Sequence, residues 1–177
     1  MNAKLIVDQA TLHKAMPIEF IYGKRYINEA MNVLASRYDD ACIQDSVDIV
    51  CTDVTADYEM PANDFGVLEV IDDSGRRYTD YRTHLGRIAF AREGTYKVVY
   101  LRGAAEIVNE ASEPEIHQIY HYPIAYYVAS VDLNRIRPGD PKAQELMVRF
   151  FNDAEAAHIR LQRPRRRGIV MSAPIWR

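Results

Sequence analysis

Two histidines four residues apart are the first residues whose types and spacing could do chemistry. His117 and His121 lie in the stretch HQIYH, and side chains at positions i and i+4 of a helix can face one metal ion. A zinc site needs further ligands from elsewhere in the chain. Pro123 disfavours a regular helix through both histidines. We therefore interpret the pair as packing or surface histidines.

Acidic clusters are the second candidates, because carboxylates bind divalent cations. The clusters are Asp39 with Asp40, Asp57 with Glu59, and Asp72 with Asp73. A carboxylate site needs oxygen ligands that converge from several elements, whereas each cluster here is local. We interpret Asp72 and Asp73 as turn residues at a hairpin tip, and Asp39 and Asp40 as the polar end of a helix.

Signatures of catalysis are absent from the sequence. It contains no nucleotide-binding glycine pattern, no nucleophile elbow and no HExxH motif. Cys42 and Cys51 lack the spacing of metal ligands, and Cys51 lies in an apolar run that is typical of a core side chain. The sequence therefore predicts no enzyme activity, no cofactor and no metal.

The C-terminal end has a composition unlike the rest of the chain. Residues 160–177 hold 6 of the 22 basic residues and none of the 25 acidic ones, so this end carries +6 and the remainder carries −9. Aliphatic residues and the single tryptophan follow the arginines, as in segments that become ordered on a partner. Pro174 favours an extended conformation suited to a groove or a sheet edge. The candidate partner-binding residues are Arg163, Arg165, Arg166, Arg167, Ile169, Ile175 and Trp176.

The rest of the composition is that of a soluble globular protein, with 48% apolar and 27% charged residues. The N-terminal stretch MNAKLIVDQA lacks the apolar core of a signal peptide, and no segment approaches the roughly 20 apolar residues of a membrane span. We expect an intracellular product with no membrane partner. It should form a single domain over residues 1–162, followed by an extended C-terminal arm over residues 163–177.

Helical periodicity predicts three main helices, at about residues 18–38, 115–136 and 140–162. Gly23 weakens the first turn of the first helix, so its regular part is expected to begin after that residue. Asp140 followed by a proline is a strong start signal for the last helix. In the first helix, the apolar stripe at helical spacing includes Ile27, Met31 and Leu34. Residues 1–17 are ambiguous and could form a short separate helix.

Alternating apolar residues predict a β-insert at about residues 46–103, between the first two helices. We expect four strands in one small antiparallel sheet, at residues 46–54, 65–71, 76–83 and 95–101. The turn DDSG should join the second strand to the third as a hairpin. The predicted fold class is α+β: a helical bundle of three main helices, an inserted small antiparallel β-sheet and an extended C-terminal arm.

Several stretches occur in an order that is found in one protein family. YINEAMNVLASRY is followed by MPANDF, by a strand with the DDSG turn and by GTYKVVYL; YPIAYYVASVDL and DPKAQELMVRFFNDAEAA complete the order. In these stretches the chain resembles head–tail adaptor proteins of tailed bacteriophages, with Met60 where the family turn Leu-Pro-x-Asp-Phe has leucine. The resemblance covers about residues 18–162. Residues 1–17 have no counterpart, and the arm is not a family motif.

The resemblance implies a structural virion protein of the neck, made in the host cytoplasm and without enzyme activity. Such proteins form a ring, usually of twelve copies, that joins the portal to tail or neck proteins and lets genomic DNA pass without specific binding. The helical part sits in the ring, the β-insert faces tail proteins or neighbouring copies, and the arm runs onto the portal. The arginines at 163 and 165–167 would pair with portal acids or approach DNA, while Ile175 and Trp176 would fill apolar pockets.

Other functions stay open at this point. The basic arm could instead belong to a nucleic-acid-binding accessory protein, whose affinity for DNA would fall steeply with salt. A second alternative is a stopper or tail-completion protein of the same virion. It belongs to the same class of structural protein but occupies a different level of the neck. A small enzyme would need a pocket with perturbed titrating groups.

Overall fold

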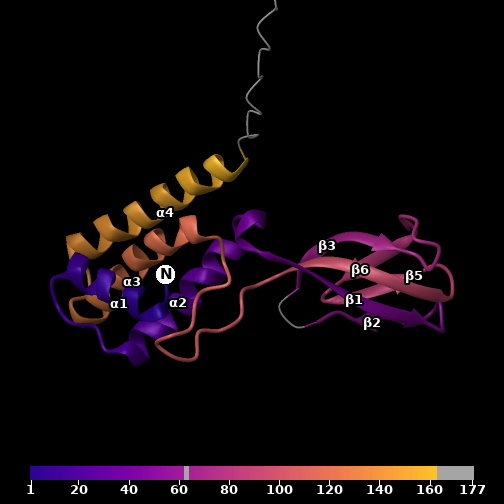
Figure 1. Cartoon of the computed structure of the whole chain (residues 1–177), viewed down its shortest axis with the longest axis horizontal. Helices are drawn as coiled ribbons and strands as arrows, with labels where there is room; N and C mark the ends of the chain where they lie inside the picture. The colour runs from indigo at the N-terminus through magenta and orange to yellow at the C-terminus, as the bar shows by residue number, and fades with distance from the viewer. Residues whose placement is uncertain (62–63, 163–177) are drawn as a thin grey trace, which may run out of the picture.

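Helices and strands separate into two lobes that lie side by side (Figure 1). The structure is a computed structural model, and it describes residues 1–61 and 64–162. The helical body comprises α1 (Ala3–Lys14), α2 (Phe20–Ala35), α3 (His121–Ile136) and α4 (Pro141–Gln162), with the short 3-10 helices η1 (Asp39–Ala41) and η2 (Gln118–Tyr120). The β-lobe comprises β1 (Ile43–Cys51), β2 (Tyr58–Glu59), β3 (Asp64–Ile71), β4 (Tyr81–His84), β5 (Arg87–Phe90) and β6 (Gly94–Arg102). The α+β class is thus confirmed.

The helical body has one core, built from the apolar stripes that the sequence shows. In α2 the residues at helical spacing, Ile27, Met31 and Leu34, are buried as expected. In α4 Leu146 and Phe150 enter the same core. Burial of these large side chains is the main favourable term for the packing of the helices.

Helix α1 adds a fourth α-helix to the three main helices that periodicity predicts. Asn2 caps it, because its side-chain oxygen accepts a hydrogen bond of 3.0 Å from the backbone N–H of Leu5. Ile6 and Val7 are buried in the core of the helical body. The ambiguous N-terminal segment is therefore part of this lobe.

The prediction that α2 becomes regular only after Gly23 is wrong. The helix begins at Phe20, and Gly23 lies buried inside it. A Cβ atom at this position would lie 2.5 Å from Cγ2 of Val7 on α1, which is closer than van der Waals contact allows. Glycine therefore permits close packing of α1 against α2, and this tertiary gain outweighs its low helix propensity.

The starts of the last two helices follow their local signals. The prediction of a helix from residue 115 is corrected, because α3 begins at His121 after η2. Pro123 lies in the first turn of α3, where its missing N–H costs no hydrogen bond. The N–H of Lys142 donates to Oδ1 of Asp140 at 2.8 Å, which confirms the predicted cap of α4.

The β-lobe holds two three-stranded antiparallel sheets, which corrects the prediction of a single four-stranded sheet. One sheet has the order β1-β6-β3 and the other β2-β5-β4. Side chains of both sheets form a separate core that includes Ile49, Phe90 and Val98. The two faces therefore pack together as a small sandwich, and residues 1–162 carry two cores.

The hairpin expected around DDSG is confirmed at its turn and wrong in its return strand. Oδ1 of Asp72 accepts hydrogen bonds from the N–H groups of Ser74 and Arg76 at 3.0 and 2.9 Å. Beyond the turn, Arg77 makes only an isolated bridge to Ile71. Strand β4 then pairs with β5 in the second sheet, and β3 pairs with β6.

Candidate functional site

The predicted partner-binding residues of the arm lie outside the described residues. They are Arg163, Arg165, Arg166, Arg167, Ile169, Ile175 and Trp176. The structure describes α4 up to Gln162, the last residue before the arm. The contacts around the end of α4 therefore fix the point at which the arm leaves the helical body.

Contacts among polar and aromatic side chains hold the C-terminal half of α4. We call this group the α4 anchor; it comprises Tyr38, Asp40, Tyr120, Glu155 and His158. The hydroxyl of Tyr38 donates to Oε2 of Glu155 at 3.0 Å. The ring of Tyr38 also lies 4.8 Å from that of His158. Nδ1 of His158 is 3.0 Å from Oδ2 of Asp40. These contacts join α4 to η1 close to the point where the arm begins.

Within the α4 anchor, Asp40 also contacts Tyr120 of η2. The hydroxyl of Tyr120, a fully buried residue, donates to Oδ1 of Asp40 at 2.6 Å. Burial raises the pKa of Tyr120 well above its ordinary value, and the hydrogen bond to Asp40 raises it further. The hydroxyl of Tyr120 therefore stays protonated and donates this hydrogen bond. Asp40 thus contacts both η2 and α4. Sequence reasoning placed Asp40 at the polar end of a helix and missed this role.

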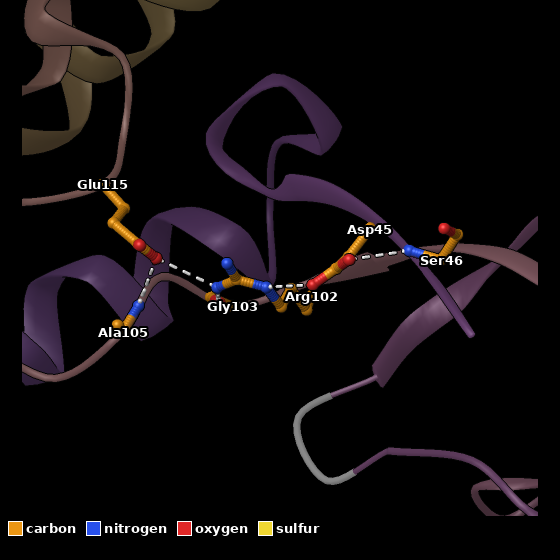
Figure 2. Close-up of polar contacts among 6 residues, drawn as sticks. All are labelled: Asp45, Ser46, Arg102, Gly103, Ala105 and Glu115. Carbon is orange, nitrogen blue, oxygen red and sulfur yellow. Dashed lines mark hydrogen bonds and ion pairs between the residues drawn. The ribbon is translucent and has the colours of Figure 1, made fainter.

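The two lobes are joined by a second set of contacts, the lobe junction, made by Asp45, Arg102 and Glu115 (Figure 2). Nε of Arg102 donates to Oδ2 of Asp45 at 2.9 Å, and Nη1 donates to Oε2 of Glu115 at 3.0 Å. Asp45 belongs to β1 and Arg102 ends β6, whereas Glu115 precedes η2 of the helical body. One guanidinium therefore links a β-lobe strand to the segment that leads into α3.

Backbone N–H groups complete the lobe junction. The N–H of Ser46 donates to Asp45 at 2.8 Å, and the N–H of Ala105 donates to Glu115 at 3.0 Å (Figure 2). These bonds, followed by the contacts with Arg102, lower the pKa of both carboxyl groups below their ordinary values. Both carboxylates are thus charged at neutral pH and occupied by donors. This arrangement positions the lobes and leaves no carboxyl group here suited to acid–base catalysis.

The structure places His117 and His121 in two different elements. His117 caps η2, where its Nδ1 accepts from the N–H of Ile119 at 3.2 Å. His121 begins α3 and is buried, with Nε2 3.1 Å from the carbonyl oxygen of Ile116. Burial lowers the pKa of His121. Within residues 1–61 and 64–162, no three histidine, cysteine or acidic side chains come together as a metal site would require.

The acidic residues are unevenly distributed along the chain. Residues 38–75, which include β1, β2 and β3, contain eleven acidic residues and no lysine or arginine. Asp72 accepts hydrogen bonds in the hairpin turn, in line with the interpretation of its cluster, and Asp53 accepts one in another turn. Asp48, Asp57 and Glu59 of this stretch are exposed, although Arg87 pairs with Glu59 and Lys97 lies opposite Asp48. A count of charges by segment would have found this signal.

Comparison with known proteins adds no family to this description. No protein-family model matches the chain, and no curated protein sequence matches it either. Among the described residues, no helix is both long and apolar enough to cross a membrane.

Proposed function

We propose that this chain is a structural virion protein, a head–tail adaptor that forms a ring joining the portal to the tail. The observation that carries the proposal is the order of the elements. Helix α2, the β-lobe, α3, α4 and then the arm follow one another along the chain, which is the order that the resemblance to head–tail adaptors implies.

In this proposal the helical body sits in the ring, with α2, α3 and α4 as the principal helices of its bundle. The β-lobe faces tail or neck proteins or a neighbouring copy. Support comes from the two separate cores and from the lobe junction, because a projecting lobe with its own core can contact a neighbour without disturbing the body.

The arm docks on the portal in this proposal. Its arginines pair with acidic side chains, and Ile169, Ile175 and Trp176 fill apolar pockets. The α4 anchor supports this role, because a segment that starts from a fixed helix end loses less freedom when it binds. The acidic remainder of the chain, at −9, suits a channel through which DNA passes without being held.

The test compares the full-length chain with a chain cut after Gln162, each mixed with portal rings and, separately, with duplex DNA. We expect the full-length chain to add a layer to the portal in electron micrographs and the cut chain to fail. DNA binding by the full-length chain that falls steeply with salt, together with no portal binding, would replace the adaptor by the nucleic-acid-binding accessory protein. A folded cut chain, checked by its circular dichroism, is needed for the comparison.

A further inference from the structure

Strand β1 forms one edge of the sheet β1-β6-β3. It pairs with β6 in continuous register from Ile43 to Cys51, whereas the pairing of β3 with β6 is interrupted by register shifts. A long regular edge can pair with a strand from another chain, unless bulges, prolines or charges prevent it. Within the described residues, β1 is therefore an edge whose geometry suits an added strand.

Two hydrogen bonds show which main-chain groups of β1 face outward. The N–H of Ser46 donates to the side chain of Asp45 rather than to β6. On the far side of β6, the carbonyl of Val70 accepts from Tyr78 at 2.7 Å and so faces away from β6. Along antiparallel strands, residues whose main-chain groups face the partner strand alternate with residues whose groups face away. Both hydrogen bonds place Ser46, and every second residue of β1 counted from it, among those that face away from β6. The outward main-chain groups of β1 belong to Gln44, Ser46, Asp48 and Val50.

The net charge of the β-lobe complements that of one segment of the chain itself. Residues 43–102 hold eleven acidic and seven basic residues. In β1, Asp45 is paired with Arg102, and exposed Asp48 lies opposite Lys97 of β6. The arm, residues 163–177, carries five arginines and no acidic residue. Attraction between the two segments would strengthen as salt is lowered.

We propose that the β1 edge of one copy accepts the arm of a second copy as an added strand. Ile169 and Val170 are β-branched and favour a strand, and the arginines at 165–167 would lie near exposed Asp48. Fifteen residues span about 50 Å when extended, and a nine-residue strand such as β1 spans about 30 Å. The arm is therefore long enough to cover the edge and to bridge two copies.

The arm of a second copy fits better than the arm of the same chain. In Figure 1 the C-terminal end of α4 lies above the molecule's long axis, and β1 lies beyond β3 and β6 when viewed from that end. The α4 anchor brings the end of α4 close to η1 and so to the start of β1. The free side of β1 nevertheless faces away from that end, so the arm of the same chain would have to turn back around the start of the strand. An arm-to-edge contact joins different surfaces of the two copies, so it leads to rings or open chains.

This inference goes beyond the portal contact. Before assembly, the arms of free copies occupy the β1 edges of other copies, and portal binding releases them. The two contacts use the same arm but different acceptors. A change in the β1 edge therefore separates them, because it removes the contact between copies and leaves the arm intact for the portal.

Val50 allows a sharp test of the edge. Its side chain is 59% exposed, and its N–H faces outward, so proline at this position removes no hydrogen bond to β6. Val50→Pro blocks an added strand, and Val50→Ala keeps the N–H and serves as the matched control. Asp48→Lys tests the charge of the edge, with Asp73→Lys at the hairpin turn as a control of equal net charge.

The measurement is sedimentation velocity of the full-length chain over a range of concentrations, at about 50 and about 500 mM NaCl. We expect self-association at low salt that weakens at high salt. Val50→Pro and Asp48→Lys should each raise the Kd by about tenfold or more, and their controls should change it by less than about threefold. A wild-type chain that stays monomeric, or equal association of all variants, would overturn the proposal.

A mixing experiment tests whether the arm and the edge come from different copies. The triple variant Arg165→Ala, Arg166→Ala and Arg167→Ala has a weakened arm and an intact β1 edge. Val50→Pro has an intact arm and a blocked β1 edge. Neither should associate alone, and their mixture should form one-to-one dimers. Failure of the mixture, with both chains folded by circular dichroism, would contradict the arm-to-edge contact. Portal binding by Val50→Pro is retained if the adaptor proposal is right, whatever the outcome here.

Discussion

The ammonium group of Lys14 on α1 pairs with the carboxylate of Asp132 on α3 inside the helical body. Their side chains are 0% and 1% exposed. The other carboxylate oxygen of Asp132 accepts from Nη2 of Arg135 at 2.8 Å, and the guanidinium of Arg135 lies over the ring of Tyr22, 4.4 Å from its centroid. The N-terminal helix is thus joined to the helical body by a charged contact as well as by apolar packing.

Replacing Lys14 by methionine should lower the free energy of unfolding by about 3–5 kcal/mol, because the buried carboxylate of Asp132 loses a partner. Urea denaturation measures this change. Lys4→Met is the matched control, since the side chains of Lys4 and Asp8 are about half exposed and such surface pairs contribute about 1 kcal/mol or less. Equal effects of the two variants would show that the buried pair does not hold α1.

Gly23→Ala tests the close packing of α1 against α2. Alanine favours a helix by about 1 kcal/mol over glycine, but its Cβ would collide with Val7. We expect a net loss of about 1–3 kcal/mol in the free energy of unfolding. The double variant Val7→Ala, Gly23→Ala should lose less than the sum of the single changes, because the smaller side chain makes room. Additive losses would argue against the contact.

Ala15→Gly should stabilise the protein. Ala15 ends α1 with φ 62°, in the left-handed region that costs L-residues roughly 1–2 kcal/mol. Glycine removes this cost but gains entropy in the unfolded chain, so the expected net gain is about 0.5–1 kcal/mol. Thermal denaturation should show a higher Tm for this variant. Ala156→Gly, at an exposed position inside α4, should instead lower it.

The fold and the site differ in how far the sequence could predict them. The stripe Ile27, Met31 and Leu34 and the cap Asp140 are local patterns, and both were predicted. Helix α1 was missed as a definite element because exposed Leu5 and Leu12 blur its apolar face. Strands β2, β4 and β5 have two to four residues, which is too short for alternation to give a clear signal.

The contacts that position the lobes could not be predicted in the same way. Arg102 and Asp45 are 57 residues apart in the sequence, and Asp40 and His158 are 118 apart. Such pairs form only when the chain folds, and no local spacing marks them. The low cost of Gly23 inside α2 likewise depends on a neighbour from another helix.

His121 should make stability depend on pH. Burial lowers its pKa below the ordinary 6.5 in the folded state, so the unfolded chain binds a proton first. The free energy of unfolding should therefore fall as the pH drops below 6.5, down to the lowered pKa. His13 has the same direction of shift, so His121→Gln should flatten this dependence without abolishing it. The measurement is urea denaturation of both chains at several values between about pH 5 and 7.5.

The mass of the complex between this chain and portal rings tests the central claim most directly. Native mass spectrometry of the mixture counts the copies bound to each ring. The adaptor proposal predicts a fixed number of copies, twelve for a twelve-fold portal, and none for the chain cut after Gln162. Portal rings whose mass does not change, or that bind a variable number of copies, would contradict it.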